Sequence, residues 1–375
     1  MFIVVFIITL LILVLIHEFG HFIMSKKFNI KVLEFGFGIP PRVWGKKIGE
    51  TLYSINLLPF GGFVRPLGED EVNAEILANK RSFAAAPVHK RIIVVVAGVV
   101  MNLFLAWILF WIVIVAQNFK VQIPLLTDHK FIGVYQTNEQ FVVIDSVSKD
   151  TPAEQAGIKV EERVVAVNDN FIKNSQDLID QTKLHAGEKI KLTLSDLEQK
   201  NYRTVEIIPR KNPPKGQGAL GVSLNSFDVA NLEFKDPLQK ILSGPIYSLN
   251  ITTYTGELLG KLISTSYQKK DITPVSQAVS GPIGMTAIIK QVLATQNPLI
   301  PYLNLLAALS LNLAIINVLP FPGLDGGRLF FLILEAITHK RTHPTLEKYV
   351  HTVGLVILLS LILLITISDI HKFLI

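Results

Sequence analysis

The strongest constraint on this chain is a run of 25 residues, from 92 to 116, that contains no charged side chain. Such a run can cross the ~30 Å hydrocarbon layer as an α-helix, which satisfies its own backbone hydrogen bonds there. Further apolar runs lie at 2–24, 303–319 and about 350–370. The first run lacks a basic start and a small-residue cleavage site, so we interpret it as a retained helix. The sequence therefore predicts about four transmembrane helices.

Basic residues predict how these helices are oriented. Residues 25–91 hold 11 Lys and Arg against 6 Asp and Glu, and Lys340, Arg341 and Lys348 lie between the last two runs. Cytoplasmic loops carry an excess of Lys and Arg. Both loops are therefore expected in the cytoplasm, which places both chain ends and residues 117–297 on the other side.

The first apolar run contains three ionisable side chains, in the sequence His17-Glu18-Phe19-Gly20-His21. Residues four apart share a helix face, so both imidazoles can reach a single Zn²⁺, and the carboxylate beside them can take a proton from a zinc-bound water. So short a pattern also arises by chance. However, each ionisable group in a membrane helix costs at least ~2.5–3.5 kcal/mol, which disfavours an idle cluster.

A catalytic zinc site needs a third protein ligand, and the candidate is Asp325. It follows the third apolar run, eight residues after Asn317 and shortly after Pro320 and Pro322. His17 lies about 22 Å along its helix and the third run reaches Pro320 after about 25 Å, at 1.5 Å per residue. Because both helices run in the same direction, both groups are expected near the cytoplasmic side. An ordinary loop or helix-cap aspartate is the alternative.

A mixed, charged stretch separates the membrane segments 1–116 and 297–375. Residues 127–212 predict a separate α+β domain, with strand-like runs at 141–144, 164–167 and 190–194. Thr151 begins a capping-box spacing, and Ser175 can cap a second helix that ends near Leu184. Residues 213–296 are expected to form a linker and an amphipathic helical region, broken at Gly244-Pro245.

The pair of motifs, H-E-x-x-H in the first span and N-x-x-P-x-P-x-L-D-G after the third, resembles the site-2 protease family of intramembrane zinc metalloproteases. The chain is most similar to the bacterial regulator-of-sigma-E protease branch, over nearly its whole length. The resemblance implies one Zn²⁺ per chain, with His17, His21 and Asp325 as ligands and Glu18 as the general base. It also implies that Asn312 and Asn317 contact substrate, for which interhelical hydrogen bonding is the alternative.

Other segments resemble parts of the same family. Gly36 and Gly38 resemble a G-x-G element, and with Pro320 and Pro322 they complete the expected substrate-binding residues. Residues 51–67, within the cytoplasmic loop 25–91, resemble a membrane-associated β-hairpin whose edge could pair with an extended substrate. A turn-rich loop packed on the bundle is the alternative. The stretch from Ala97 to Asn102 also resembles the family, although close helix packing by Gly98 explains it equally well. Residues 152–157, followed by 164–168, resemble a PDZ domain.

These features predict a multi-pass α-helical membrane protein with a membrane-associated β-hairpin and an extracytoplasmic α+β PDZ-like domain. The resemblance implies regulated intramembrane proteolysis in the bacterial plasma (inner) membrane, with the active site near the cytoplasmic side. The expected substrates are transmembrane segments of single-span proteins, such as anti-sigma factors already trimmed by another protease, or remnant signal peptides. The lipid bilayer is the other expected partner, and no basic and aromatic patch indicates nucleic acid.

Two other classes of function compete with this interpretation. A non-enzymatic PDZ-type membrane scaffold would leave the ionisable cluster and Asp325 without a purpose. A metal transporter would need polar groups along its helices, whereas the second span contains only Asn102. The remaining histidines lack partners at metal-ligand spacing, and we expect them at surfaces or interfaces: His89, His129, His185, His339, His343 and His351.

Overall fold

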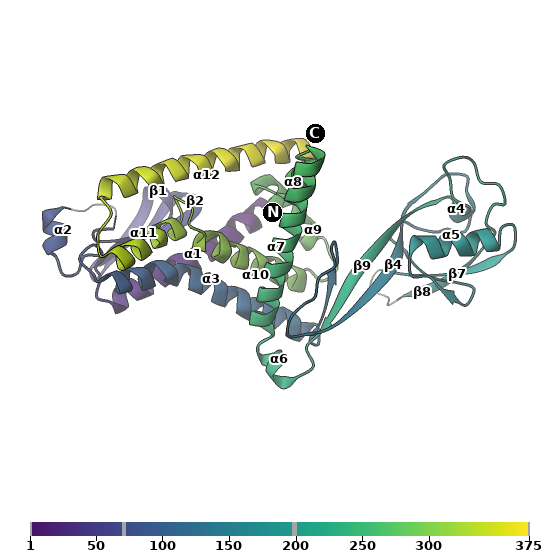
Figure 1. The fold of residues 1–375 in the computed structure, drawn as a ribbon, viewed down its shortest axis with the longest axis horizontal. Helices are drawn as coiled ribbons and strands as arrows, with labels where there is room; N and C mark the ends of the chain where they lie inside the picture. The colour runs from purple at the N-terminus through teal and green to yellow at the C-terminus, as the bar shows by residue number, and fades with distance from the viewer. Residues whose placement is uncertain (1, 70–72, 197–200, 374–375) are drawn as a thin grey trace. The chain divides into compact units, whose positions relative to one another are not determined.

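The structure is a computed structural model that describes residues 2–69, 73–196 and 201–373. Its chain divides into two compact units, of which one comprises Met1–Ala116 with Ile241–Ile375 and the other Gln117–Lys240. Figure 1 shows the helices and strands of both units.

Four helices of the described chain are long and apolar enough to cross a membrane, as predicted. They are α1 (Phe2–Lys27), α3 (Val88–Ala116), α10 (Leu299–Val318) and α12 (Pro344–Phe373). In the last of these, the candidate span is Thr345–Lys372, which is longer than the run of 350–370 expected from sequence. The multi-pass α-helical fold class is therefore confirmed.

Helix α3 packs against both α1 and α10. Gly20 of α1 lies so close to the carbonyl of Ala97 in α3 that no side chain would fit. Nearer the start of α1, Thr9 Oγ1 lies 2.8 Å from Tyr302 Oη of α10. Small residues allow membrane helices to approach closely, and hydroxyl groups form hydrogen bonds between them.

Helix α11 (Asp325–Thr338) follows α10 after a short turn that contains Pro320 and Pro322. Its amphipathic stretch is tied to α3 by an ion pair between Arg91 and Glu335. A second ion pair joins Arg328, in the first turn of α11, to Glu69 after the hairpin. The two ion pairs hold α11, which begins with Asp325, against α3 and against the segment that follows the hairpin.

The hairpin consists of β1 (Val32–Ile48) and β2 (Thr51–Pro66), followed by α2 (Ala74–Ala78). It begins earlier than the 51–67 expected from sequence. Phe35 pairs with both Tyr53 and Val64, so each strand bends back on itself. The result is four antiparallel segments in the order 62–66, 32–39, 51–58 and 42–48.

A buried carboxylate in segment 32–39 binds a side chain from each of the other three segments. Ser54 Oγ donates a hydrogen bond of 2.7 Å to Glu34, whose carboxylate also pairs with Arg42 at 3.0 Å and Arg65 at 3.3 Å. Because a buried charge is tolerated only when it is paired and hydrogen-bonded, this cluster stabilises the bent arrangement.

The segment before α10 contains α6 (Pro237–Ile241), α7 (Ser243–Lys269), α8 (Thr273–Ala278) and α9 (Pro282–Leu293). The break expected at Gly244-Pro245 was placed too late, because the helices separate at Leu242 and Pro245 occupies the first turn of α7, where proline is tolerated. The buried carboxylate of Asp369 in α12 accepts hydrogen bonds from the N–H groups of Gly281 and Gly284, at 2.9 and 2.7 Å. A side chain from α12 thus caps the start of α9.

The unit Gln117–Lys240 contains one antiparallel sheet in the order β3-β9-β4-β5-β7-β8, with β6 paired to β5. Its strands are β3 (Lys120–Pro124), β4 (Tyr135–Val147), β5 (Arg163–Val167), β6 (Asn170–Phe171), β7 (Ile190–Ser195), β8 (Tyr202–Ile207) and β9 (Val222–Glu233). All three strand-like runs predicted from sequence lie within strands of this sheet. β3 and β9 extend the unit beyond the expected range of 127–212.

Two helices, α4 (Pro152–Gln155) and α5 (Ser175–Leu184), accompany this sheet. Thr151 caps α4 as predicted. The predicted cap of α5 was wrong by one residue, because Asn174 accepts from the N–H of Asp177 at 2.9 Å while the Asp177 carboxylate accepts from the Asn174 N–H. The core contains apolar residues of the sheet and both helices, including Val142, Ala153, Val164, Leu178 and Leu192.

Candidate active site

Three potential metal ligands converge between α1 and the start of α11. Asp325 Oδ2 lies 2.9 Å from His17 Nε2 and 3.1 Å from His21 Nε2, and the two imidazole nitrogens are 3.2 Å apart. Within the described chain, this is the group of three such side chains whose donor atoms could hold one metal ion. The structure therefore brings together the residues that the two sequence motifs single out, although 308 positions separate His17 from Asp325.

Local sequence explains how Asp325 reaches this place. Pro320 and Pro322 cannot continue α10, and the chain turns through Gly323 with φ of +96°, a conformation that favours glycine. Asp325 is then the first residue of α11, where the helix dipole favours a carboxylate. Gly326 packs against the carbonyl of Leu319, so the turn closes tightly.

Helix α3 supplies the outer partners of both imidazoles. The carbonyl of Val94 lies 2.8 Å from His21 Nδ1, and the Asn102 amide lies 3.2 Å from His17 Nδ1. Gly98 lies between them, and a Cβ at this position would be 2.8 Å from His17 Cε1 and 2.7 Å from His21 Cε1. The absence of a side chain at Gly98 is therefore what allows the two rings to pack on α3.

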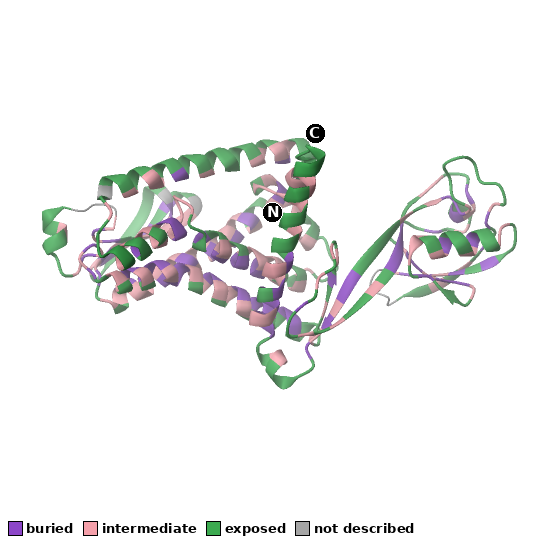
Figure 2. Ribbon diagram, in the orientation of Figure 1, coloured by how far each residue is buried: buried purple, intermediate pink, exposed green. Residues whose placement is uncertain are grey.

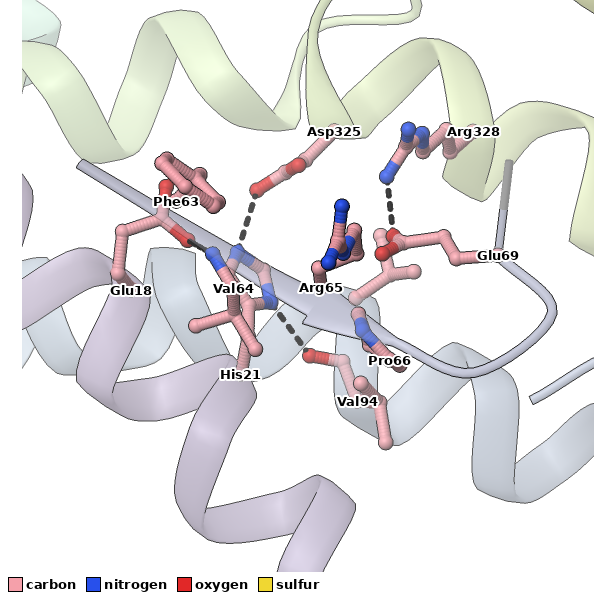
Figure 3. A pocket seen from close by; sticks show the side chains of 11 residues that line it. Glu18, His21, Phe63, Val64, Arg65, Pro66, Glu69, Val94, Asp325 and Arg328 are labelled. Carbon is pink, nitrogen blue, oxygen red and sulfur yellow. Dashed lines mark hydrogen bonds and ion pairs between the residues drawn. The ribbon is translucent and has the colours of Figure 1, made fainter. Parts of the chain in front are cut away.

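Glu18 points toward the hairpin. Its Oε2 accepts a hydrogen bond of 3.0 Å from the backbone N–H of Val64, as Figure 3 shows. Val64 pairs with Phe35 on one side, so the other edge of segment 62–66 faces Glu18 and His21. Glu18 and Asp325 both line a cavity of about 340 Å³ beside this edge.

A larger cavity of about 830 Å³ also includes His17, Glu18 and Asp325 in its walls. It extends along α11 and α12, and its lining combines apolar side chains with the ion pair of Arg91 and Glu335. Asn317, a predicted substrate-binding residue, is buried on α10 and lines this cavity.

The other predicted substrate-binding residues lie elsewhere. Asn312 is exposed on α10 and is not among the residues lining the two cavities above. Gly36 packs against the ring of Phe63 within the hairpin, and Gly38 adopts φ of +78° at its bend. Pro320 is exposed, and Pro322 packs against Gly354 of α12. A substrate contact for each of them stays a prediction.

His351 lies at an interface, one of the two places expected for it. It lines the larger cavity, and its Nδ1 accepts a hydrogen bond of 3.0 Å from the N–H of Gly323. The sequence did not indicate this partner. The interaction joins α12 to the turn before Asp325, and no local spacing in the sequence indicates that these segments meet.

A comparison with solved structures found the PDZ domain of an SdrC-like protein from Listeria monocytogenes. It is 20% identical, covers 26% of this chain and 93% of that domain, and has a TM-score of 0.20.

The similarity of this chain to known proteins extends over nearly the whole sequence and includes both motifs. A candidate zinc metalloprotease of Clostridium acetobutylicum is 30% identical over 364 residues, which cover 96% of this chain and 94% of that protein. Proteins named zinc metalloprotease RasP are 26% identical in Geobacillus kaustophilus and 25% in Oceanobacillus iheyensis, over 96% and 99% of both chains, respectively. The sequence profile of peptidase family M50 matches residues 5–361. The chain therefore belongs to peptidase family M50, the zinc metalloproteases of the site-2 type.

Proposed function

We propose that this zinc metalloprotease is an endopeptidase that hydrolyses peptide bonds within the transmembrane segments of single-span membrane proteins. The observation that carries the proposal is the convergence of His17, His21 and Asp325. Two of these three residues, with Glu18 beside them, belong to a helix that is long and apolar enough to span a membrane.

The residues fit a zinc ion in both chemistry and spacing. Two imidazole nitrogens and one carboxylate oxygen form a ligand set typical of catalytic zinc, which keeps one position open. Bonds of 2.0–2.1 Å in a tetrahedron give ligand-to-ligand distances of about 3.3 Å. The three donor atoms here are 2.9, 3.1 and 3.2 Å apart. We therefore assign His17, His21 and Asp325 as the ligands.

When bound, Zn²⁺ would supply Lewis-acid activation of the peptide carbonyl and of the attacking water. Glu18 is the general base of the reaction. Its carboxylate takes up the proton of the attacking water and passes it to the leaving amine. The Val64 N–H holds Glu18 Oε2 beside the cavity that Asp325 also lines, which keeps the carboxylate close to the ligands.

The hairpin edge is the proposed place for the substrate backbone. A peptide bond in an intact helix has its carbonyl hydrogen-bonded and shielded, so the segment to be cut must first be extended. Segment 62–66 has one edge paired with β1 and the other directed at Glu18. An extended peptide can add to such an edge by main-chain hydrogen bonds. Asn317 lines the adjoining cavity, and Asn312, Gly36, Gly38, Pro320 and Pro322 are further proposed contacts or supports.

The excess of basic residues in 25–91 supports an orientation with the hairpin and active site near the cytoplasmic side of a bacterial plasma membrane. The unit Gln117–Lys240 then lies outside, where a PDZ-like domain would restrict access by untrimmed proteins. Trimmed anti-sigma factors and remnant signal peptides are the proposed substrates. The bacterial relatives that cover nearly the whole chain support this setting.

The proposal is tested with Glu18→Gln in purified protein and in cells. We expect cleavage of a tethered single-span reporter to fall by at least about 100-fold, the range for loss of a general base, while membrane insertion and one tightly held zinc per chain persist. Glu75→Gln, at an exposed position in α2, is the matched control. Trimmed stubs that accumulate with Glu18→Gln identify the substrates. Unchanged cleavage by that variant would exclude the mechanism, and a zinc-free wild type would favour the scaffold.

A further inference from the structure

We propose that Asn102 is a positioning residue of the metal centre, whose amide oxygen accepts a hydrogen bond from Nδ1–H of His17. The inference rests on the proposed function and adds a determinant of zinc affinity that lies outside the ligand set.

Asn102 is fully buried in α3, a helix long and apolar enough to cross a membrane. Its Nδ2 lies 3.2 Å from His17 Nδ1, and its Oδ1 has no hydrogen-bond partner among the described residues. A buried amide in an apolar helix is costly unless it is hydrogen-bonded. The contact with His17 is therefore the hydrogen bond that can offset this cost.

The chemistry of imidazole decides which end of the amide must face His17. A neutral imidazole carries one N–H, and a metal ligand needs the lone pair of the nitrogen that binds. His17 Nε2 is the nitrogen that faces Asp325 and His21, so the proton of a ligating His17 resides on Nδ1. Nδ1–H is a donor, and of the two ends of the Asn102 amide only Oδ1 accepts.

The oxygen and nitrogen of an amide occupy nearly equivalent positions, which a rotation of 180° exchanges. The rotation places Oδ1 3.2 Å from His17 Nδ1, where Nδ2 now lies. It leaves Nδ2 as the end without a partner in place of Oδ1, so the number of unpaired amide ends does not change. The imidazole, however, gains the acceptor that a ligating tautomer requires.

His21 provides an independent parallel. Its Nδ1 lies 2.8 Å from the carbonyl of Val94, which can only accept, so its proton is on Nδ1 and its Nε2 faces Asp325. Val94, Gly98 and Asn102 follow one another at intervals of four on one face of α3. One helix thus gives an acceptor to each imidazole, and Gly98 leaves room for both rings.

The position of Asn102 is itself fixed. Ser310 of α10 is buried, and its Oγ donates a hydrogen bond of 2.8 Å to the backbone carbonyl of Asn102. The amide is therefore held on a helix that packs against both α1 and α10. Metal-ligating histidines commonly depend on such partners for ring orientation and affinity.

The test compares the zinc affinity of Asn102→Leu and Asn102→Asp with that of the wild type, by competition with a chelator. We expect Asn102→Leu to bind zinc 10–100-fold more weakly, the range for loss of a ligand's hydrogen-bond partner. Aspartate can accept but not donate, so Asn102→Asp should recover most of the affinity. Val100→Ala, at an exposed position of the same helix, is the control and should keep wild-type affinity.

A second readout is the nitrogen-15 spectrum of the zinc-loaded wild type with labelled histidine, in which His17 should be protonated on Nδ1. This readout also decides the case if Asn102→Leu fails to fold. Equal affinity of Asn102→Leu and wild type, equal loss in Asn102→Asp and Asn102→Leu, or a proton on Nε2 of His17 would each overturn the inference. A wild type that holds no zinc would instead overturn the proposed function itself.

Discussion

Helices α3 and α12 are both apolar enough to span a membrane, yet they relate to the rest of the protein in opposite ways. In the most apolar window of α3, 39% of the residues are buried, against 6% in α12. Figure 2 shows the same contrast, with buried residues recurring along α3 and few on α12. The buried helix contributes acceptors to both histidines, whereas the exposed one touches its neighbours at a few points.

Those points on α12 are polar or tightly packed. His351 accepts from Gly323, Gly354 packs against Pro322, and Asp369 caps α9. Near its end, Lys372 Nζ donates to the carbonyls of Ser276 and Val279. Since lipid tails are as apolar as leucine, burial of apolar side chains does little to hold membrane helices together. Individual hydrogen bonds therefore matter more on α12 than on a helix surrounded by protein.

The largest expected effect would break the contribution of α3 to the site. In Gly98→Ala the added methyl group would collide with the rings of His17 and His21. We expect zinc affinity to fall by at least about 100-fold, the upper end for changes beside the ligands. Chelator competition measures it, with Val100→Ala, at an exposed position of the same helix, as the control. Undiminished affinity in Gly98→Ala would show that the rings do not pack on α3.

A smaller effect is expected on α12. His351→Ala removes the acceptor of the part-buried Gly323 N–H. The cost should lie below the roughly 1–3 kcal/mol of a fully buried donor left unpaired. His351→Asn can still accept through its side-chain oxygen and should be closer to wild type. Thermal unfolding in detergent measures both, and His343→Ala, at an exposed position, should remain near wild type. If all three variants unfold at the same temperature, the contact between α12 and the turn does not contribute to stability.

The smallest effect on stability is expected at Glu50. Its two ion-pair partners lie outside α3 and α12, so a variant at Glu50 measures the contribution of a site that involves neither helix. Hydrogen bonds from Arg81 and Lys26 lower the pKa of Glu50 from 4.5 to about 2. A lowered pKa stabilises the fold fully above pH 4.5, and this contribution is lost as the pH falls toward 2. Glu50→Gln should cost at most ~1 kcal/mol at pH 7, as for other accessible pairs.

Melting temperatures of wild type and Glu50→Gln between pH 7 and pH 3 measure this contribution. The difference between the two proteins should narrow as the solution becomes more acidic. A difference that is independent of pH would mean that Glu50 acts through packing rather than charge.

The parts of the fold that the sequence predicted depend on local or strongly periodic signals. Long apolar runs predicted four membrane helices because a segment of that length and composition has few alternatives. The spacing of His17 and His21 placed both on one helix face, and the proline-rich motif around Asp325 supplied the third residue. The capping pattern at Thr151 likewise predicted the start of α4.

The contacts that were not predicted join segments whose approach only the folded chain creates. The Val64 N–H reaches Glu18 because β2 bends back along β1, and the buried Glu34 cluster holds that bend. Asn102 was visible as the polar residue of the second span, but nothing in the sequence indicated which side chain it faces. At α5, Asn174 and Ser175 are both good N-cap residues, so the sequence alone did not indicate which of them caps the helix.

The separation of His17 and Asp325 along the chain has a consequence for biosynthesis. The first motif is translated 308 positions before Asp325, so with the ligands proposed above the nascent polypeptide spends most of its synthesis with two histidines and no third ligand. The proposed hydrolysis then requires that the third hydrophobic segment has been made and has folded beside the first. The order of the two motifs would thus delay the appearance of proteolytic activity until nearly the whole polypeptide has been made.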